Sequence, residues 1–211
     1  MLTILVFRTL GIGLALRHGT KTNGFRSPAF RMFSVIIPTH DSERPLVHTL
    51  AALVPGATAG IVREVIIADA QSNDETEQVA DIAGCVFFSS GEPLGARLKT
   101  AAARARSDWL MFLRPGVVPA PSWIDEPIAF IQQDQGKAAV FSAETGGLAS
   151  SMRRLFSVLP RPEQGLIVAK PFYAELGGHR ADATDPERDL LRRIGGSRLT
   201  VLRTTVRQIL I

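Results

Sequence analysis

The sequence has little that would support a disulfide, a histidine metal site or a membrane span. Its single cysteine, Cys85, excludes an intramolecular disulfide, and the apolar run that follows it predicts a buried structural thiol. The four histidines show no spacing typical of metal ligands. The apolar stretch within residues 1–17 is interrupted by Arg8 and is shorter than the ~20 residues that a spanning helix needs. These features favour a globular protein in a reducing, cytoplasmic setting.

Acidic residues are absent from residues 1–31, which hold five basic ones. The net charge of +4 belongs to this segment, because the rest of the chain has 19 basic and 20 acidic residues. We predict that residues 1–31 are a basic, apolar leader outside the globular domain. The leader is either a membrane-surface amphipathic segment or a disordered stretch upstream of the native start. We favour the second, because Met32 directly precedes the first strand, and we expect residues 32–211 to form a single domain.

Short apolar runs alternate with helical patterns along the rest of the chain. We predict strands at 33–37, 63–68, 86–89, 109–113, 138–141 and 166–168. Helices are expected at 42–54, after 76, and at 95–106, 121–133, 171–176 and 185–194, with the first stopped by Pro55 and Gly56. Residues 142–162 are expected to be a loop or a partly helical connector. This alternation predicts an α/β fold with a parallel sheet, in which polar residues after each strand share the ligand-binding edge.

The polar segments lie in an order that resembles glycosyltransferase family 2, in particular its compact bacterial members. The matching segments are 34–39, 68–76, 95–99, 112–113, 121–123, 164–168, 176–178 and 189–194. The resemblance implies a GT-A (Rossmann-like) fold, with a mainly parallel sheet flanked by helices. It also implies transfer of a sugar from a nucleotide-sugar donor to a hydroxyl acceptor with inversion. The acceptor would be lipid-linked or a polysaccharide of the bacterial cell envelope.

By this resemblance, Asp69 grips the nucleotide base at the end of the second strand, and Pro38 and Thr39 line the same pocket through backbone atoms. A carboxylate at a strand's carboxyl edge can accept hydrogen bonds from a base or a ribose. The alternative is that Asp69 only ends the strand or caps the next turn. Asp74 precedes a helix, so capping is its expected role.

The chain departs from the family where relatives carry an acidic metal-binding motif. Arg114 and Gly116 stand at those positions and supply no carboxylate, so we expect neither a metal nor any other cofactor. Arg97, Lys99 and Arg114 are candidates to neutralise the donor diphosphate instead. The alternative for Arg97 and Lys99 is that both are solvated on a helix face.

The resemblance places the general base at Glu187, where the family has a catalytic aspartate, with Asp185 as the fallback. The extra methylene of Glu187 moves the carboxylate by about 1 Å. The alternative is that both acids only stabilise a helix N-terminus. Glu163 and Gln164 match a polar pair on the acceptor side.

Two functions therefore stay open: a metal-independent or weakly active transferase, and a catalytically silent GT-A domain that binds a nucleotide sugar or a protein. A nucleotidyltransferase is disfavoured, because the chain has no Gly-rich phosphate loop. No nucleic-acid partner is expected. A C-terminal arginine cluster contacts the diphosphate, contacts a lipid acceptor at the inner membrane, or is simply solvated.

Overall fold

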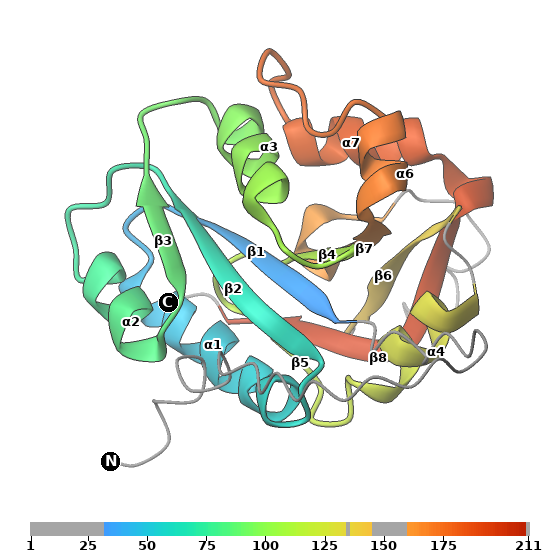
Figure 1. Ribbon diagram of the computed structural model, residues 1–211, viewed down its shortest axis with the longest axis horizontal. Helices are drawn as coiled ribbons and strands as arrows, with labels where there is room; N and C mark the ends of the chain where they lie inside the picture. The colour runs from blue at the N-terminus through green and yellow to red at the C-terminus, as the bar shows by residue number, and fades with distance from the viewer. Residues whose placement is uncertain (1–31, 134–135, 145–159, 210–211) are drawn as a thin grey trace, which may run out of the picture.

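The computed structural model describes residues 32–133, 136–144 and 160–209. The strands are β1 (Phe33–Thr39), β2 (Val62–Asp69), β3 (Val86–Ser89), β4 (Trp109–Phe112), β5 (Val117–Pro119), β6 (Ala138–Ala143), β7 (Leu166–Ala169) and β8 (Leu199–Gln208). The helices are α1 (Glu43–Thr58), α2 (Thr76–Ala83), α3 (Leu94–Arg104), α4 (Asp125–Gln133), α6 (Lys170–Glu175) and α7 (Pro186–Ile194), with short 3-10 turns η1 (Pro162–Gln164) and η2 (Gly196–Arg198). Figure 1 shows α3, α6 and α7 on one side of the sheet and α1, α2 and α4 on the other.

All eight strands form one sheet, in the order β3-β2-β1-β4-β7-β6-β8-β5. β1, β2, β3 and β4 are parallel, and every residue of β1 is buried. Their apolar, β-branched sequences are typical of strands covered on both faces. Thr39 of β1 pairs with Asp69 of β2, which pairs with Ser89 of β3, so three polar residues meet at one carboxyl edge. The expected α/β fold with a mainly parallel sheet is confirmed.

The second half of the sheet departs from the predicted alternation. β7 runs antiparallel to both β4 and β6, and β5 runs antiparallel to β8. β5 and β8 were not predicted from the sequence. β8 lies between β6, with which it pairs in parallel, and the edge strand β5, although only Leu202 and Val206 of its ten residues are buried. The antiparallel strands bring the segment before β7 to the end of β4.

The predicted stop of the first helix at Pro55 and Gly56 is wrong, because α1 continues to Thr58. Gly56 is buried against the fully buried ring of Trp123, and a Cβ at Gly56 would lie 2.5 Å from that ring. The indole N–H of Trp123 donates to the Ala52 carbonyl at 3.0 Å. Gly56 therefore serves close packing, which outweighs its weak helix propensity.

The other predicted elements lie close to the observed ones, within the described residues. Cys85 packs against the core, and burial raises the pKa of its thiol to about 12, which fits the expected structural role. The predicted leader, residues 1–31, and most of the predicted connector, residues 142–162, lie outside the described residues. Within the described part of the chain, no helix is both long and apolar enough to cross a membrane.

Candidate active site

Asp69 joins the ends of three parallel strands. It is 1% exposed, and its carboxylate accepts hydrogen bonds from the hydroxyls of Thr39 at 2.7 Å and Ser89 at 2.9 Å. Ser72 adds its backbone N–H at 2.9 Å and its hydroxyl at 2.5 Å. Burial alone would raise the pKa of Asp69, but these hydrogen bonds lower it below its usual value. The four donors match the acceptor capacity of a carboxylate, so a ligand must displace one of them to contact Asp69 directly.

The loops after β1 and β2 are locked together beside Asp69. Asp41 accepts from the backbone N–H of Asn73 at 2.7 Å, and its own N–H donates to the Ser72 hydroxyl at 2.8 Å. Asp41 and Gln71 both have a positive φ, of 46° and 57°, which is uncommon outside glycine. Such backbone conformations cluster at ligand sites, because the surrounding contacts must hold them in place.

Asp74 contributes to the same loops as a capping residue, as expected. Its carboxylate accepts from the N–H and hydroxyl of Thr76 at the start of α2, and from the Glu43 N–H at the start of α1. Two helices are therefore fixed to one edge of the sheet by one side chain.

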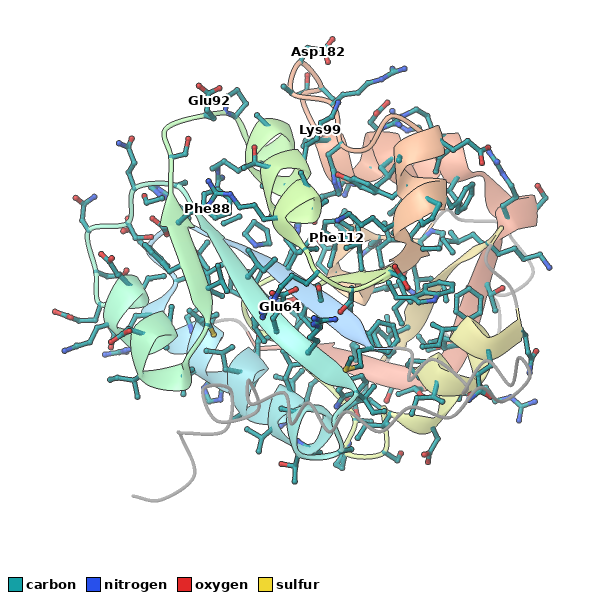
Figure 2. All side chains as sticks on the ribbon, in the orientation of Figure 1. Glu64, Phe88, Glu92, Lys99, Phe112 and Asp182 are labelled. Atoms are coloured by element: carbon teal, nitrogen blue, oxygen red, sulfur yellow. The ribbon has the colours of Figure 1, made fainter. Side chains whose placement is uncertain are left out.

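Arg97 lies beneath this edge, and the alternative that it is solvated on a helix face is wrong. It is 8% exposed, and it donates to the carbonyls of Ala68 at 2.5 Å and Thr39 at 3.4 Å. Burial lowers the pKa of Arg97, while the charge of Asp69 opposes that effect. Lys99 is exposed on α3, as the solvated alternative expected (Figure 2). Arg97 therefore stabilises the carboxyl ends of β1 and β2, and Lys99 is the accessible cation of the two.

A second cluster forms at the end of β4 and joins residues far apart in the sequence. Arg114 contacts Glu163 of η1 at 2.8 Å, and its Nε and Nη2 both donate to Oε2 of Glu187 on α7, at 2.9 Å and 2.5 Å. The structure thus brings together three of the predicted site residues. Because both bonds to Glu187 end on Oε2, no hydrogen bond from the described residues reaches its Oε1.

Glu187 is held as a buried carboxylate beside a single cation. Glu187 is 9% exposed, and burial raises its pKa above the ordinary value. Arg114 opposes this increase, while the charges of Asp185 and Glu163 add to it. A raised pKa, a clamped oxygen and a second oxygen without a protein donor are properties suited to a general base.

Asp185 and Gln164 are occupied elsewhere. Asp185 caps α7 by accepting from the Arg188 N–H at 3.0 Å, and it forms an ion pair with the same side chain at 3.2 Å. The Gln164 amide donates to the Phe141 carbonyl at 2.7 Å and accepts from the Arg161 N–H at 2.9 Å. Two polar pairs were predicted near the base, Asp185 with Glu187 and Glu163 with Gln164. Only Glu187 and Glu163 contact Arg114.

Gly116 stands at the metal-motif position in a conformation that excludes a carboxylate. Its φ is +83°, and a Cβ would lie 2.5 Å from the Ile209 carbonyl oxygen. Its N–H donates to the Thr49 hydroxyl at 2.9 Å. Among the described residues, no group of three or more His, Cys, Asp or Glu could hold a metal ion. With an arginine and a glycine at these positions, the donor set does not fit a hard divalent cation.

The sequence did not predict a buried tyrosine–histidine pair near Glu187. Tyr173 and His179 form a buried pair, and Phe112 packs on both rings, with centroid distances of 5.5 Å and 4.8 Å. Gly177 and Gly178 signalled a turn there, but nothing in the sequence placed His179 beside Glu187. A separate cavity of about 550 Å³ lies between α1, β5 and β8, and none of the predicted site residues lines it.

Comparisons with known proteins agree with the fold. The family model described as "Glycosyl transferase family 2" matches residues 34–168. No curated protein sequence matches the chain.

Among solved structures, glucosyl-3-phosphoglycerate synthase from Mycobacterium tuberculosis, bound to Mn²⁺, UDP and glucosyl-3-phosphoglycerate, is 19% identical with a TM-score of 0.67; the alignment covers 86% of this chain and 73% of that one. A mannosyltransferase from Pyrobaculum calidifontis with GDP-Man and Mn²⁺ is 14% identical with a TM-score of 0.71, over 86% and 58% of the two chains. GalNAc-T7 with UDP, GalNAc and Mn²⁺ is 16% identical with a TM-score of 0.71, over 87% and 45%. These likenesses establish a shared GT-A fold. Because the family model spans well over half of the sequence, the chain belongs to glycosyl transferase family 2.

Proposed function

We propose that this protein transfers a sugar from a nucleotide-sugar donor to a hydroxyl acceptor, with inversion and without a divalent metal. The observation that carries the proposal is the contact of Arg114 with Glu187 and Glu163 at the end of β4. By the family resemblance, this contact supports the proposal because it joins a permanent cation in the metal-motif segment to a buried carboxylate at the position of the catalytic acid. The structural relatives named above hold UDP or GDP-Man, which supports a nucleotide-sugar donor.

The nucleotide would bind at the carboxyl edge of β1 and β2. Pro38 and Thr39 would line this edge through backbone atoms, and Asp69 and Arg97 both hydrogen-bond to Thr39. Because the protein already occupies all acceptor positions of Asp69, we assign it the role of holding the loops in their positive-φ conformations. Direct contact with the base would require the Ser72 hydroxyl to move aside.

The diphosphate would be neutralised by Lys99 and Arg114, and the backbone at Gly116 would border this part of the site. Lys99 is exposed, and the guanidinium of Arg114 has a geometry that suits phosphate oxygens. Arg97 would add positive charge at this edge without binding the diphosphate directly, because its side chain donates to the backbone carbonyls of Thr39 and Ala68. Glu163 and Glu187 place negative charge directly against Arg114, and Asp185 adds to it, which suits an uncharged acceptor hydroxyl on that side of the site.

Glu187 would act as the general base through its Oε1 atom. The acceptor hydroxyl oxygen attacks the anomeric carbon as its proton passes to Oε1. The bond from that carbon to the phosphate oxygen breaks, and the nucleoside diphosphate leaves with the electron pair. Arg114 holds Oε2, so the free oxygen keeps a fixed direction. Asp185 remains the second choice, limited by its role in capping α7.

A second candidate is a GT-A domain that binds a nucleotide sugar without turnover. The loss of carboxylates at the metal-motif position, where Arg114 and Gly116 stand, favours it. The two functions share the nucleotide site and differ only in whether Glu187 accepts a proton.

Nucleotide release from UDP-glucose and GDP-mannose by the full chain, in EDTA and in Mn²⁺, separates the two. A transferase releases UDP or GDP equally in both conditions, and Glu187→Gln lowers the rate by about 10²-fold or more. Glu175→Gln is the matched control. Glu175 is an exposed acid on the neighbouring helix α6, and it forms a 3.7 Å ion pair with Arg198. Binding without release from either donor supports the silent domain, and release that requires Mn²⁺ contradicts the metal-independent proposal.

A further inference from the structure

A buried tyrosine–histidine pair lies between α6 and α7. The Tyr173 hydroxyl accepts the backbone N–H of His179 at 3.0 Å and lies 2.9 Å from Nδ1 of the same residue. Both residues are buried, at 5% and 1% exposure. Burial raises the pKa of Tyr173 to about 12 and lowers the pKa of His179 to about 3. Both side chains are therefore neutral across the physiological range.

This contact fixes which ring nitrogen of His179 carries the proton. The Tyr173 hydroxyl has one hydrogen, and among the described residues its available acceptor is Nδ1 of His179. A buried hydroxyl rarely leaves its hydrogen unpaired. With Nδ1 accepting, a neutral imidazole carries its proton on Nε2. No hydrogen bond from the described part of the chain satisfies that Nε2–H.

The turn that carries His179 is rigid. Gly178 has a φ of +68°, and a Cβ there would lie 2.9 Å from the Tyr173 ring. Arg193 on α7 donates to the carbonyls of Leu176 at 2.5 Å and Gly178 at 2.7 Å, and it pairs with Asp189 at 2.7 Å. The helix that carries Glu187 is thus bonded directly to the turn that carries His179.

His179 and Glu187 line one small cavity. The cavity measures about 10 Å³, near the size that admits one water molecule. Its remaining lining is apolar or backbone: Phe112, Pro162, Gly165, Leu166 and Leu191. The polar side chains that border it are therefore a neutral N–H donor and a carboxylate.

We propose that His179 is a positioning residue for Glu187, whose carboxylate it holds by a hydrogen bond from Nε2–H through one water in this cavity. The catalytic consequence rests on the proposed function, but the contact itself does not. The charged groups around the pair are Arg114 after β4, Glu163 on η1, and Asp185, Asp189 and Arg193 on or before α7. A donor to Glu187 favours its charged form, so loss of His179 raises the pKa of the base.

Nitrogen-15 NMR of the full chain with labelled histidine tests the contact without any substrate. We expect His179, assigned by the signal that His179→Phe removes, to show the Nε2–H tautomer from pH 5 to 8. Its Nε2 shift should follow the titration of Glu187, and Glu187→Gln should abolish that dependence. Tyr173→Phe keeps the imidazole but removes the group that fixes it, so a mixture of tautomers should appear. An Nδ1–H tautomer in the wild type, or an Nε2 shift that ignores Glu187→Gln, overturns the proposal.

The pH dependence of nucleotide release supplies the catalytic readout. His179→Phe should raise the apparent pKa of the acidic limb of kcat/KM by about 1, because a hydrogen bond to a charged group is lost. An unchanged limb in a folded variant overturns the positioning role. If the wild type releases no nucleotide from any donor, the proposed function fails, while the NMR result still decides whether His179 contacts Glu187.

Discussion

Replacing Arg114 with methionine removes the one cation that contacts Glu187 among the described residues and leaves that carboxylate buried. The side chains of Arg114 and Glu187 are 33% and 11% exposed, so the pair lies between a surface and a buried ion pair. Breaking a buried pair from one side costs about 3–5 kcal/mol, whereas exposed pairs contribute about 0–1 kcal/mol. We therefore expect Arg114→Met to lower the free energy of unfolding by about 2 kcal/mol at pH 7.

The loss should depend on pH in a defined direction. Burial raises the pKa of folded Glu187, and removing Arg114 raises it further. The destabilisation is then largest above that raised pKa and shrinks as the pH falls, because below the unfolded value of about 4.3 Glu187 is mostly neutral in both states. Urea unfolding of the wild type and variant between pH 4 and 8 measures this difference.

A double-mutant cycle with Glu187→Gln isolates the interaction. Glu187→Gln removes the charge that Arg114→Met leaves unpaired, so the double variant should regain most of the lost stability, with a coupling energy of about 1.5 kcal/mol. A coupling energy below about 0.3 kcal/mol, or a destabilisation that is the same at pH 4.5 and pH 7, refutes the reasoning.

Three further predictions concern the sheet edge and its glycines. Gly116→Asp restores an acid at the metal-motif position, but the positive φ and the Ile209 carbonyl should cost about 2 kcal/mol or more in urea unfolding, with no gain in Mn²⁺ affinity by calorimetry. Gly95→Ala places a Cβ 2.0 Å from the Arg180 carbonyl oxygen, so the segment before α7 must shift. Nucleotide release should fall by about 10-fold or more, and an unchanged rate contradicts this prediction. The hydrogen bonds of Asp69 lower its pKa, so its stabilisation is present above the unfolded pKa of about 3.9 and is lost as the pH falls through the folded value. Asp69→Asn should flatten the loss of stability in acid, and an unchanged acid limb would count against the network.

The sequence predicted the parallel half of the fold well, because that half depends on local patterns. β1 and β2 are apolar runs buried on both faces, and the polar residues after them can lie only at the carboxyl edge. β8 was not predicted because its polar and arginine-containing sequence alternates poorly, and only Leu202 and Val206 of its residues are buried. The end of α1 was predicted wrongly because Gly56 packs closely against Trp123, which lies 67 positions away in the sequence.

The site was predictable as a list of residues but not as a set of contacts. Family resemblance indicated Arg114, Glu163 and Glu187 separately, and the sequence held no sign that one guanidinium binds both acids across 49 and 73 positions. The burial of Arg97 could not be predicted, because helical spacing does not reveal that its side chain reaches the carbonyls at the ends of β1 and β2. His179 was set aside, because a lone histidine gives no signal without its neighbours.

The central claim is that this edge of the sheet binds a nucleotide without a metal. Isothermal titration of the full chain with UDP and with GDP, each in EDTA and in Mn²⁺, tests it most directly. Binding of one nucleotide with the same affinity in both conditions, weakened by Asp69→Ala because the loops lose their anchor, is the expected result. Affinity that appears only with Mn²⁺, or no binding of either nucleotide in any condition, would contradict the claim.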